Sequence, residues 1–345
     1  MSSPPPPGSP PEAPEAPEAP EGIEGLEDAV LGRLGALRGR LGAELGGAFD
    51  RLAARLRLFE GRAGEGYFSH PAALPVLELP VWIAGHAARR GAAGPSSTTR
   101  TTRALALAEA AAVGYLRVRI EDDWFDEGIG EPGEAAMLAQ ALFARHQALL
   151  SRELPADRGF WALFEEVWLG YGEAMLLERR LHRGEAPHDA DAFRRVLARS
   201  RPLVLPAAAA LFAAGREGDL GALERAVEAL AKAHQLFADL LHAERDRAQG
   251  NTTHVLFRLG ARGGGDAAAL GAALFGGGGF DAIVAEARAE IARAQEAAGE
   301  LDAPELTRFL SRRGAWMAEI QAQVFLALLA GPAAGASADR DRAPR

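Results

Sequence analysis

The chain has 345 residues, 48% of them hydrophobic, and its 38 Lys and Arg against 47 Asp and Glu give a formal net charge of −9. This acidic balance without a basic stripe argues against a nucleic-acid partner, whose phosphates require clustered Lys and Arg. Because the sequence contains no Cys, disulfides, thiolate metal sites and Cys nucleophiles are excluded, which suits a cytoplasmic protein. No apolar run reaches the roughly 18 residues of a membrane span, so no span is expected.

The two ends of the chain differ from the rest in composition. Residues 1–22 are rich in Pro and Glu and offer little to bury, which predicts a disordered tail. Residues 331–345 lack hydrophobic periodicity and are predicted to form a second tail. Residues 23–330 contain no fixed-period repeat and no long linker, so we expect one domain.

Apolar residues recur at helical spacing through most of residues 23–330, and no strand pattern is present. The fold is therefore predicted to be all-α. The expected helices cover residues 23–59, 98–127, 134–150, 159–183, 190–214, 220–248, 280–298 and 304–329. Prolines 71, 75 and 80 are expected to break the chain after the first of these. The glycine clusters at 260–265 and 276–279 fit either a flexible lid or plain disorder.

The first candidate functional segment is residues 121–127, where five of seven residues are acidic near a predicted helix end. Asp122 and Asp126 lie one turn apart on one helix face. Two carboxylates there repel each other and the negative end of the helix dipole. A divalent cation would resolve this conflict, and hard oxygen donors favour Mg²⁺. The alternative is a solvated acidic helix end.

A second predicted helix carries a polar stripe. Gln235, Asp239, His242 and Asp246 follow each other at i, i+4, i+7 and i+11 and share one face. For this helix alone, an exposed polar face is the alternative. Two acidic stripes in one helical domain together indicate facing carboxylates that hold divalent ions between them.

The sequence resembles the class I isoprenoid synthases, which include trans-prenyl diphosphate synthases and terpene cyclases. DDWFDE at 122–127 matches their first aspartate-rich motif, DDxxD, and HQLFADLLHAERDRAQGNTT at 234–253 is similar to their second metal motif. Arg199 and Ser200 stand where prenyl synthases carry a Lys-Thr pair. The resemblance covers residues 68–329 and implies a single-domain helical bundle in which the two motifs face each other across a central apolar pocket.

The resemblance also implies an activity and a set of site residues. Mg²⁺ ions would grip the diphosphate of an allylic prenyl diphosphate and stabilise it as it leaves. The implied metal ligands are Asp122, Asp123, Asp126, Asp239 and Asp246, of which all but Asp123 are also assigned to catalysis. The implied diphosphate contacts are Arg199, Gln235, His242, Arg312 and Arg313. For Arg312 and Arg313, plain surface arginines are the alternative.

Two departures from the family pattern decide between its members. Prenyl synthases carry Gly-Lys-x-Arg before DDxxD and Arg-Arg-Gly after it, whereas residues 70–80 and 128–136 here contain no Lys or Arg. Without these cations, binding of isopentenyl diphosphate and chain elongation are hard to support. The predicted function is therefore a terpene cyclase that uses one allylic diphosphate, and a trans-prenyl diphosphate synthase is the alternative.

The second motif is also incomplete, because Ala238 and His242 replace two of its expected ligands. A non-catalytic relative that binds an isoprenoid is therefore a third interpretation. A homodimer is plausible from the resemblance to prenyl synthases. Four aromatic residues are candidates either to line the pocket or to belong to the core: Tyr115, Trp161, Trp168 and Tyr171.

Overall fold

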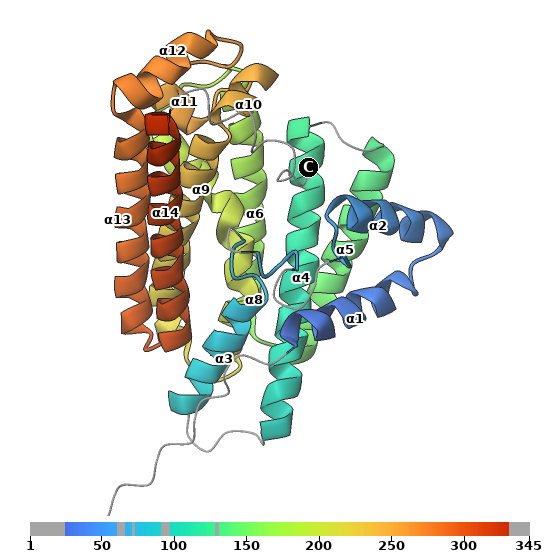
Figure 1. Ribbon diagram of the computed structural model, residues 1–345. Coiled ribbons are helices and arrows are strands. Elements are labelled where there is room, and N and C mark those ends of the chain that lie inside the picture. Colours follow the sequence, from blue (N-terminus) through green and yellow to red (C-terminus); the bar gives the residue numbers. More distant parts are fainter. Residues whose placement is uncertain (1–24, 61–65, 71–72, 91–96, 128–130, 331–345) are drawn as a thin grey trace, which may run out of the picture.

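The structure is a computed structural model that describes residues 25–60, 66–70, 73–90, 97–127 and 131–330 (Figure 1). Within these ranges every regular element is a helix and no strand occurs, so the all-α prediction is confirmed. The two predicted tails, at 1–22 and 331–345, lie outside the described residues.

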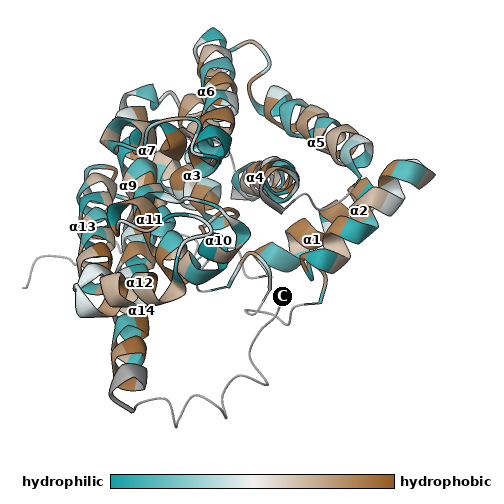
Figure 2. Ribbon diagram, turned by 90° about the horizontal axis from the view of Figure 1, so that it is seen from above, coloured by the Kyte–Doolittle hydropathy of each residue, from teal (hydrophilic) through white to brown (hydrophobic). Residues whose placement is uncertain are grey.

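The central element is α4 (Ser97–Glu127), a helix of 31 residues that spans about 46 Å. Figure 2 looks along α4 and shows it standing between two groups of helices. Its neighbours include α5 (Pro132–Glu153), α3 (Glu78–Arg90) and α8 (Val204–Phe212). The acidic segment at the end of α4 therefore lies between the two groups.

The N-terminal segment forms two helices where the sequence predicts one over residues 23–59. These are α1 (Leu26–Arg38), which packs on α4, and α2 (Ala43–Arg55), which packs on α5. Gly39 and Gly42 lie in the break between them. Glycine costs about 1 kcal/mol relative to alanine inside a helix, so two glycines within four residues end α1 and allow the chain to turn.

Helix α3 is absent from the sequence prediction, because its prolines were expected only to break the chain. It begins at Glu78, so Pro80 occupies its first turn. Backbone N–H groups in a first turn have no partner within the helix, and a proline there removes no hydrogen bond. The helix can therefore continue to Arg90.

The predicted helix at 190–214 is divided into three parts. Helix α7 (Ala190–Val196) is followed by the 3₁₀ segment η1 (Leu197–Leu203) and then by α8. Pro202 lies inside η1. A proline cannot donate the i to i−4 hydrogen bond of an α-helix, which accounts for the tighter winding here. Both α8 and η1 pack against α6 (Arg158–His182).

The other group of helices is built on α9 (Leu220–Leu241), which packs along α13 (Gly279–Glu300). Helix α14 (Pro304–Ala330) then packs on α13. The predicted helix at 220–248 is interrupted at His242, after which α10 (Ala243–Gln249) starts. The first half of the polar stripe therefore lies on α9 and its last residue, Asp246, on α10.

The glycine-rich region after α10 is partly helical. It contains α11 (His254–Arg258), α12 (Ala267–Gly271) and the π-helical turn η3 (Ala272–Gly276). A 3₁₀ turn, η2 (Glu217–Asp219), precedes α9. Gly278 has a φ of 69° just before α13, a conformation that glycine adopts without strain.

Buried apolar residues from both groups of helices form one continuous core, in which Phe49, Leu116, Phe160 and Leu205 are fully enclosed. Among the described residues, no single helix is long and apolar enough to cross a membrane. The stretches 267–276 and 279–300 meet the length and composition requirement only together, and they are bent by 62° relative to each other.

Helices α4 and α5 approach each other closely at Gly114. A Cβ atom at this position would lie 2.9 Å from Nδ1 of His146 on α5. That nitrogen donates a hydrogen bond of 2.8 Å to the carbonyl oxygen of Ala110. Burial lowers the pKa of His146 to about 4, so the imidazole is neutral in the folded protein near neutral pH. The contact leaves no room for a side chain at position 114.

Candidate functional site

A cavity of about 370 Å³ lies between α4, α6, η1, α9 and α10. Its lining combines acidic, basic and apolar side chains. The acidic residues are Asp122, Asp123, Glu178, Asp239 and Asp246, and the basic ones are Arg119, Arg199, Arg245, His182, His234 and His242. The apolar part of the lining includes Leu74, Ala111, Val118, Met175 and Leu203. Such a cavity offers one polar region and one apolar region to a ligand.

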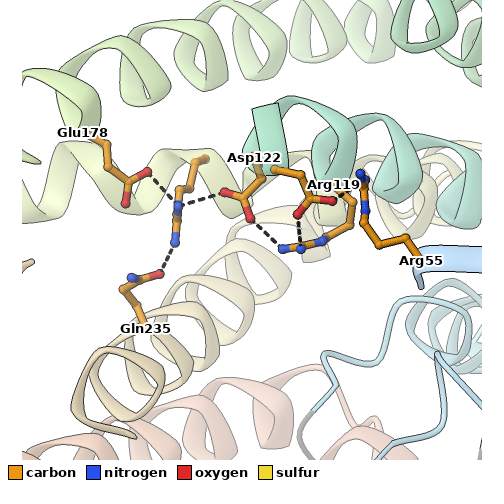
Figure 3. Close-up of polar contacts among 7 residues, drawn as sticks. Arg55, Arg119, Asp122, Glu178 and Gln235 are labelled. Carbon is orange, nitrogen blue, oxygen red and sulfur yellow. Dashed lines mark hydrogen bonds and ion pairs between the residues drawn. The ribbon is translucent and has the colours of Figure 1, made fainter. Parts of the chain in front are cut away.

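The first acidic segment contributes two described carboxylates to the lining of the cavity, and guanidinium groups bind both of them (Figure 3). Asp122 accepts hydrogen bonds from Nη1 of Arg119 at 2.6 Å and from Nη1 of Arg199 at 3.3 Å. Asp123 is buried and accepts from Nη2 of Arg55 at 2.5 Å and from Nη2 of Arg119. The side chain of Asp126 lies outside the described part of the structure.

Arg199 connects three helical elements from its position on η1. In addition to Asp122 on α4, its Nη1 donates to Oε2 of Glu178 on α6 at 2.7 Å. Its Nη2 donates to Oε1 of Gln235 on α9 at 2.5 Å. Burial raises the pKa of Glu178, and the charge of Arg199 opposes this effect. Arg199, which is predicted to contact the diphosphate, thus joins the polar side chains of α4, α6 and α9.

The second stripe is held by different interactions. Nε2 of Gln235 donates to Oδ1 of Asp239 at 2.6 Å. Asp239 is buried, and this burial raises its pKa to about 7. Burial also raises the pKa of Asp246 and lowers that of His242, which lines the same cavity. The structure therefore brings the predicted residues of this stripe to one cavity.

The two predicted arginines of the last helix do not line the cavity. Arg312 is exposed on α14. Arg313 is buried, its Nη2 donates to the carbonyl oxygen of Ala73, and its guanidinium lies 5.3 Å and 5.5 Å from the ring centres of Phe309 and Trp316. Burial lowers the pKa of Arg313 to about 10. The site as described contains neither arginine.

Arg119, Glu178 and His234 are among the cavity residues that sequence reasoning missed. Arg119 could have been found, because it precedes Asp122 by three residues and the i, i+3 spacing favours a contact on a helix. Glu178 and His234 gave no such signal, since their role depends on how α6 and α9 pack. Burial lowers the pKa of His234 to about 3.

The four aromatic candidates separate into two groups. Tyr115 lines the cavity. Trp161, Trp168 and Tyr171 instead belong to an aromatic cluster around Phe164, in which ring centres lie 5.1 Å to 6.3 Å apart. These three residues are packed with α5 and α6, and they contribute to the core.

The donor atoms of the cavity fit a hard divalent cation in kind, because they are carboxylate oxygens from both acidic stripes. Within the described part, however, no three His, Asp or Glu side chains are grouped closely enough to hold a metal ion. The described carboxylates of α4 are bound to arginines instead. A divalent cation at Asp122 or Asp123 would compete with these guanidinium groups.

At the level of sequence, no protein-family model and no curated protein matches the chain. Solved structures do match. The polyprenyl synthase ISP_B of Roseobacter denitrificans is 15% identical, with coverage of 85% of this chain and 98% of that chain and a TM-score of 0.56. A decaprenyl diphosphate synthase of Rhodobacter capsulatus is 16% identical; the match covers 85% of this chain and 98% of that chain, with a TM-score of 0.57.

A third match is a polyprenyl synthase of Caulobacter crescentus CB15 complexed with calcium and isoprenyl diphosphate. It is 17% identical; the match covers 84% of this chain and 97% of that chain, with a TM-score of 0.55. The chain thus has the fold of the polyprenyl synthases over nearly their whole length. The class I isoprenoid synthase fold expected from the two motifs is confirmed.

Proposed function

We propose that the protein binds an allylic prenyl diphosphate in this cavity and transfers its prenyl group. The observation that carries the proposal is the meeting of both acidic stripes and Arg199 in one cavity of a polyprenyl synthase fold. Asp122 and Asp239 are more than a hundred residues apart in the sequence and are joined through Arg199 and Gln235. The polar region would receive the diphosphate, and the apolar region would receive the hydrocarbon chain.

The proposed cofactor is Mg²⁺, held by Asp122 and Asp126 from one stripe and by Asp239 and Asp246 from the other. The ion would neutralise the negative charge that develops on the departing diphosphate. The complex of the Caulobacter crescentus synthase with calcium and isoprenyl diphosphate supports the use of a divalent cation in this fold.

The protein's own residues have separate tasks in this proposal. Arg199 would donate to phosphate oxygens, for which its planar guanidinium is suited. Gln235 orients Asp239, because its amide donates to that carboxylate. The apolar lining at Ala111, Val118 and Met175 would exclude water from the allylic carbon.

Prenyl transfer is preferred to cyclisation because the structural neighbours are polyprenyl synthases. Cyclisation is the second candidate, and one observation favours it: residues 70–80 and 128–136 lack the basic residues of a second diphosphate site. A cyclase needs only one allylic diphosphate, so it does not require that site.

The test is release of inorganic pyrophosphate from geranyl, farnesyl and geranylgeranyl diphosphates, with and without Mg²⁺ and isopentenyl diphosphate. Mass spectrometry of the organic phase identifies the product. Extended diphosphates that form only with isopentenyl diphosphate would establish transfer to that acceptor, whereas Mg²⁺-dependent hydrocarbons formed without it would establish cyclisation. Binding of the substrates with no pyrophosphate release under any condition would leave a non-catalytic isoprenoid-binding protein.

A further inference from the structure

Arg119 is a cation of the cavity for which the proposed function has no task so far. It precedes Asp122 by one helical turn on α4 and lines the cavity. Nη1 donates to Oδ2 of Asp122 at 2.6 Å, and Nη2 donates to Oδ1 of Asp123. Its Nε is buried and has no hydrogen-bond partner among the described residues. The guanidinium therefore has an unused donor.

Both carboxylates that Arg119 contacts also have another cation. Asp123 is bound by Arg55 from α2 at 2.5 Å, and Asp122 is approached by Arg199 at 3.3 Å. If Arg119 moves, neither carboxylate is left without a positive neighbour. An unpaired buried charge is the main cost of breaking a buried ion pair, so this arrangement lowers the cost of exchange.

The position of Arg119 also matches a need of the ligand. The diphosphate is a multiply charged anion that requires several cations. The two segments at which prenyl synthases carry basic residues, 70–80 and 128–136, contain no Lys or Arg here. Arg119 binds Oδ2 of Asp122 and Arg199 binds Oδ1, and both arginines line the cavity.

We infer that Arg119 is a diphosphate-binding residue with two alternating partners, the carboxylates of Asp122 and Asp123 in the empty cavity and the diphosphate in the loaded one. This inference rests on the proposed function. A divalent cation held by Asp122 would compete with the Arg119 guanidinium for that carboxylate. The displaced guanidinium would then be available to the phosphate oxygens, to which it can donate two parallel hydrogen bonds.

The exchange predicts opposite effects of removing the charge at Arg119. Without its competitor, a divalent cation alone should bind more tightly to Asp122. Without a phosphate donor, a prenyl diphosphate should bind more weakly. A merely structural role of Arg119 cannot give this result, because a disturbed cavity would weaken the binding of both.

The experiment uses the full chain as wild type, Arg119→Gln, Arg119→Lys and the control Arg103→Gln. Arg103 lies on the same helix, is paired with Glu153 at 2.8 Å, and is about 24 Å away along α4. Electron paramagnetic resonance measures the binding of Mn²⁺ alone. Titration calorimetry measures the binding of farnesyl thiodiphosphate in the presence of Mg²⁺.

For Arg119→Gln we expect about threefold to tenfold tighter Mn²⁺ binding, because a positive neighbour is lost. Farnesyl thiodiphosphate should bind about tenfold to a hundredfold more weakly, the usual effect of one charged hydrogen-bonding group. Arg119→Lys keeps the positive charge but lacks the forked pair of N–H donors of the guanidinium. Its affinity for farnesyl thiodiphosphate should therefore fall only about threefold. Arg103→Gln should match the wild type in both titrations.

Two results would overturn the assignment. If Arg119→Gln weakens both ligands, or changes neither, while the wild type binds farnesyl thiodiphosphate, Arg119 has no role in exchange. Should Arg119→Gln fail to fold, equal thiodiphosphate affinity of Arg119→Lys and wild type would refute the need for a forked donor. If the wild type itself binds no farnesyl thiodiphosphate at any Mg²⁺ concentration, the proposed function is wrong and Arg119 loses its second partner.

Discussion

The two acidic stripes of the cavity compensate their carboxylates by different means. At the end of α4, Asp122 and Asp123 are bound by guanidinium groups from three elements. On α9, Asp239 receives an amide hydrogen bond from Gln235, and burial raises its pKa to about 7. We therefore expect the first stripe to be sensitive to competing cations and the second to be sensitive to pH as well. The aspartates of one site are thus stabilised in two different ways, by ion pairs in the first stripe and by a hydrogen bond in the second.

Of the substitutions considered, Asp122→Asn in the first stripe should have the largest effect on activity. The amide keeps the size of the side chain but removes the charge that a divalent cation requires. We expect pyrophosphate release to fall at least about a hundredfold, since the leaving diphosphate loses its metal. Asp191→Asn is the matched control, because Asp191 is exposed and pairs only with the neighbouring Arg194 at 2.9 Å among the described contacts. Unchanged release by Asp122→Asn would exclude Asp122 as a metal ligand.

Arg199→Gln tests the connection between the two stripes. This change leaves the buried carboxylate of Glu178 without its guanidinium. The free energy of unfolding, measured with urea, should fall by about 3 kcal/mol, as for other broken buried pairs. The double variant Arg199→Gln/Glu178→Gln removes both charges and should recover more than half of that loss. Equal stability of Arg199→Gln and wild type would contradict a stabilising role of Arg199 between the two stripes.

Asp239→Asn tests the pH response of the second stripe. The folded pKa of about 7 lies above the ordinary value of 3.8, so the proton retained on folding stabilises the protein below about pH 4. This contribution is lost as the pH rises to about 7. The variant should therefore gain stability relative to wild type from pH 4 to 7, by a few kcal/mol, and the difference should be constant above pH 7.

Asp50 provides the control of opposite sign for this experiment. Its hydrogen bond from Arg38 lowers its pKa below 3.8. The ionised form is therefore favoured by folding, and its contribution is lost only as the pH falls below about 4. Asp50→Asn should show a constant difference from wild type between pH 4 and 7. A difference for Asp239→Asn that is also constant would refute the buried, proton-retaining state.

The smallest expected effect comes from making the two stripes more alike. The double variant Ala238→Asp/His242→Asp places carboxylates at the two positions where the second motif departs from the family pattern. Two more oxygen donors should lower the Mg²⁺ concentration for half-maximal pyrophosphate release by about tenfold or less. Leu241→Asp adds a carboxylate at an exposed position of the same helix end and serves as the control. An increased requirement for Mg²⁺ in the double variant would count against metal binding by this stripe.

Much of the fold could be predicted from hydrophobic periodicity. The helices at 98–127, 159–183, 280–298 and 304–329 correspond to α4, α6, α13 and α14 within two residues at each end. Periodicity failed where backbone chemistry decided the outcome. Gly39 and Gly42 divide the first helix, Pro202 tightens η1, and Pro80 is accommodated in the first turn of α3.

The site was predictable where its residues follow each other on one helix. Gln235, Asp239 and His242 share a face by spacing alone, and the structure places all three at the cavity. Glu178 could not be predicted, because its contact with Arg199 arises from the packing of α6 against η1. Arg312 is exposed in the structure, so its assignment to the diphosphate stays a prediction.

The close contact at Gly114 links the wall of the cavity to the packing of α4 against α5. Gly114 lines the cavity, and a Cβ atom at this position would lie 2.9 Å from Nδ1 of His146 on α5. The ring of His146 in turn stacks on Phe164, with 5.8 Å between the ring centres. Any larger residue at position 114 would have to displace this ring, so a substitution made to reshape the cavity here would also disturb the contact between the two helices.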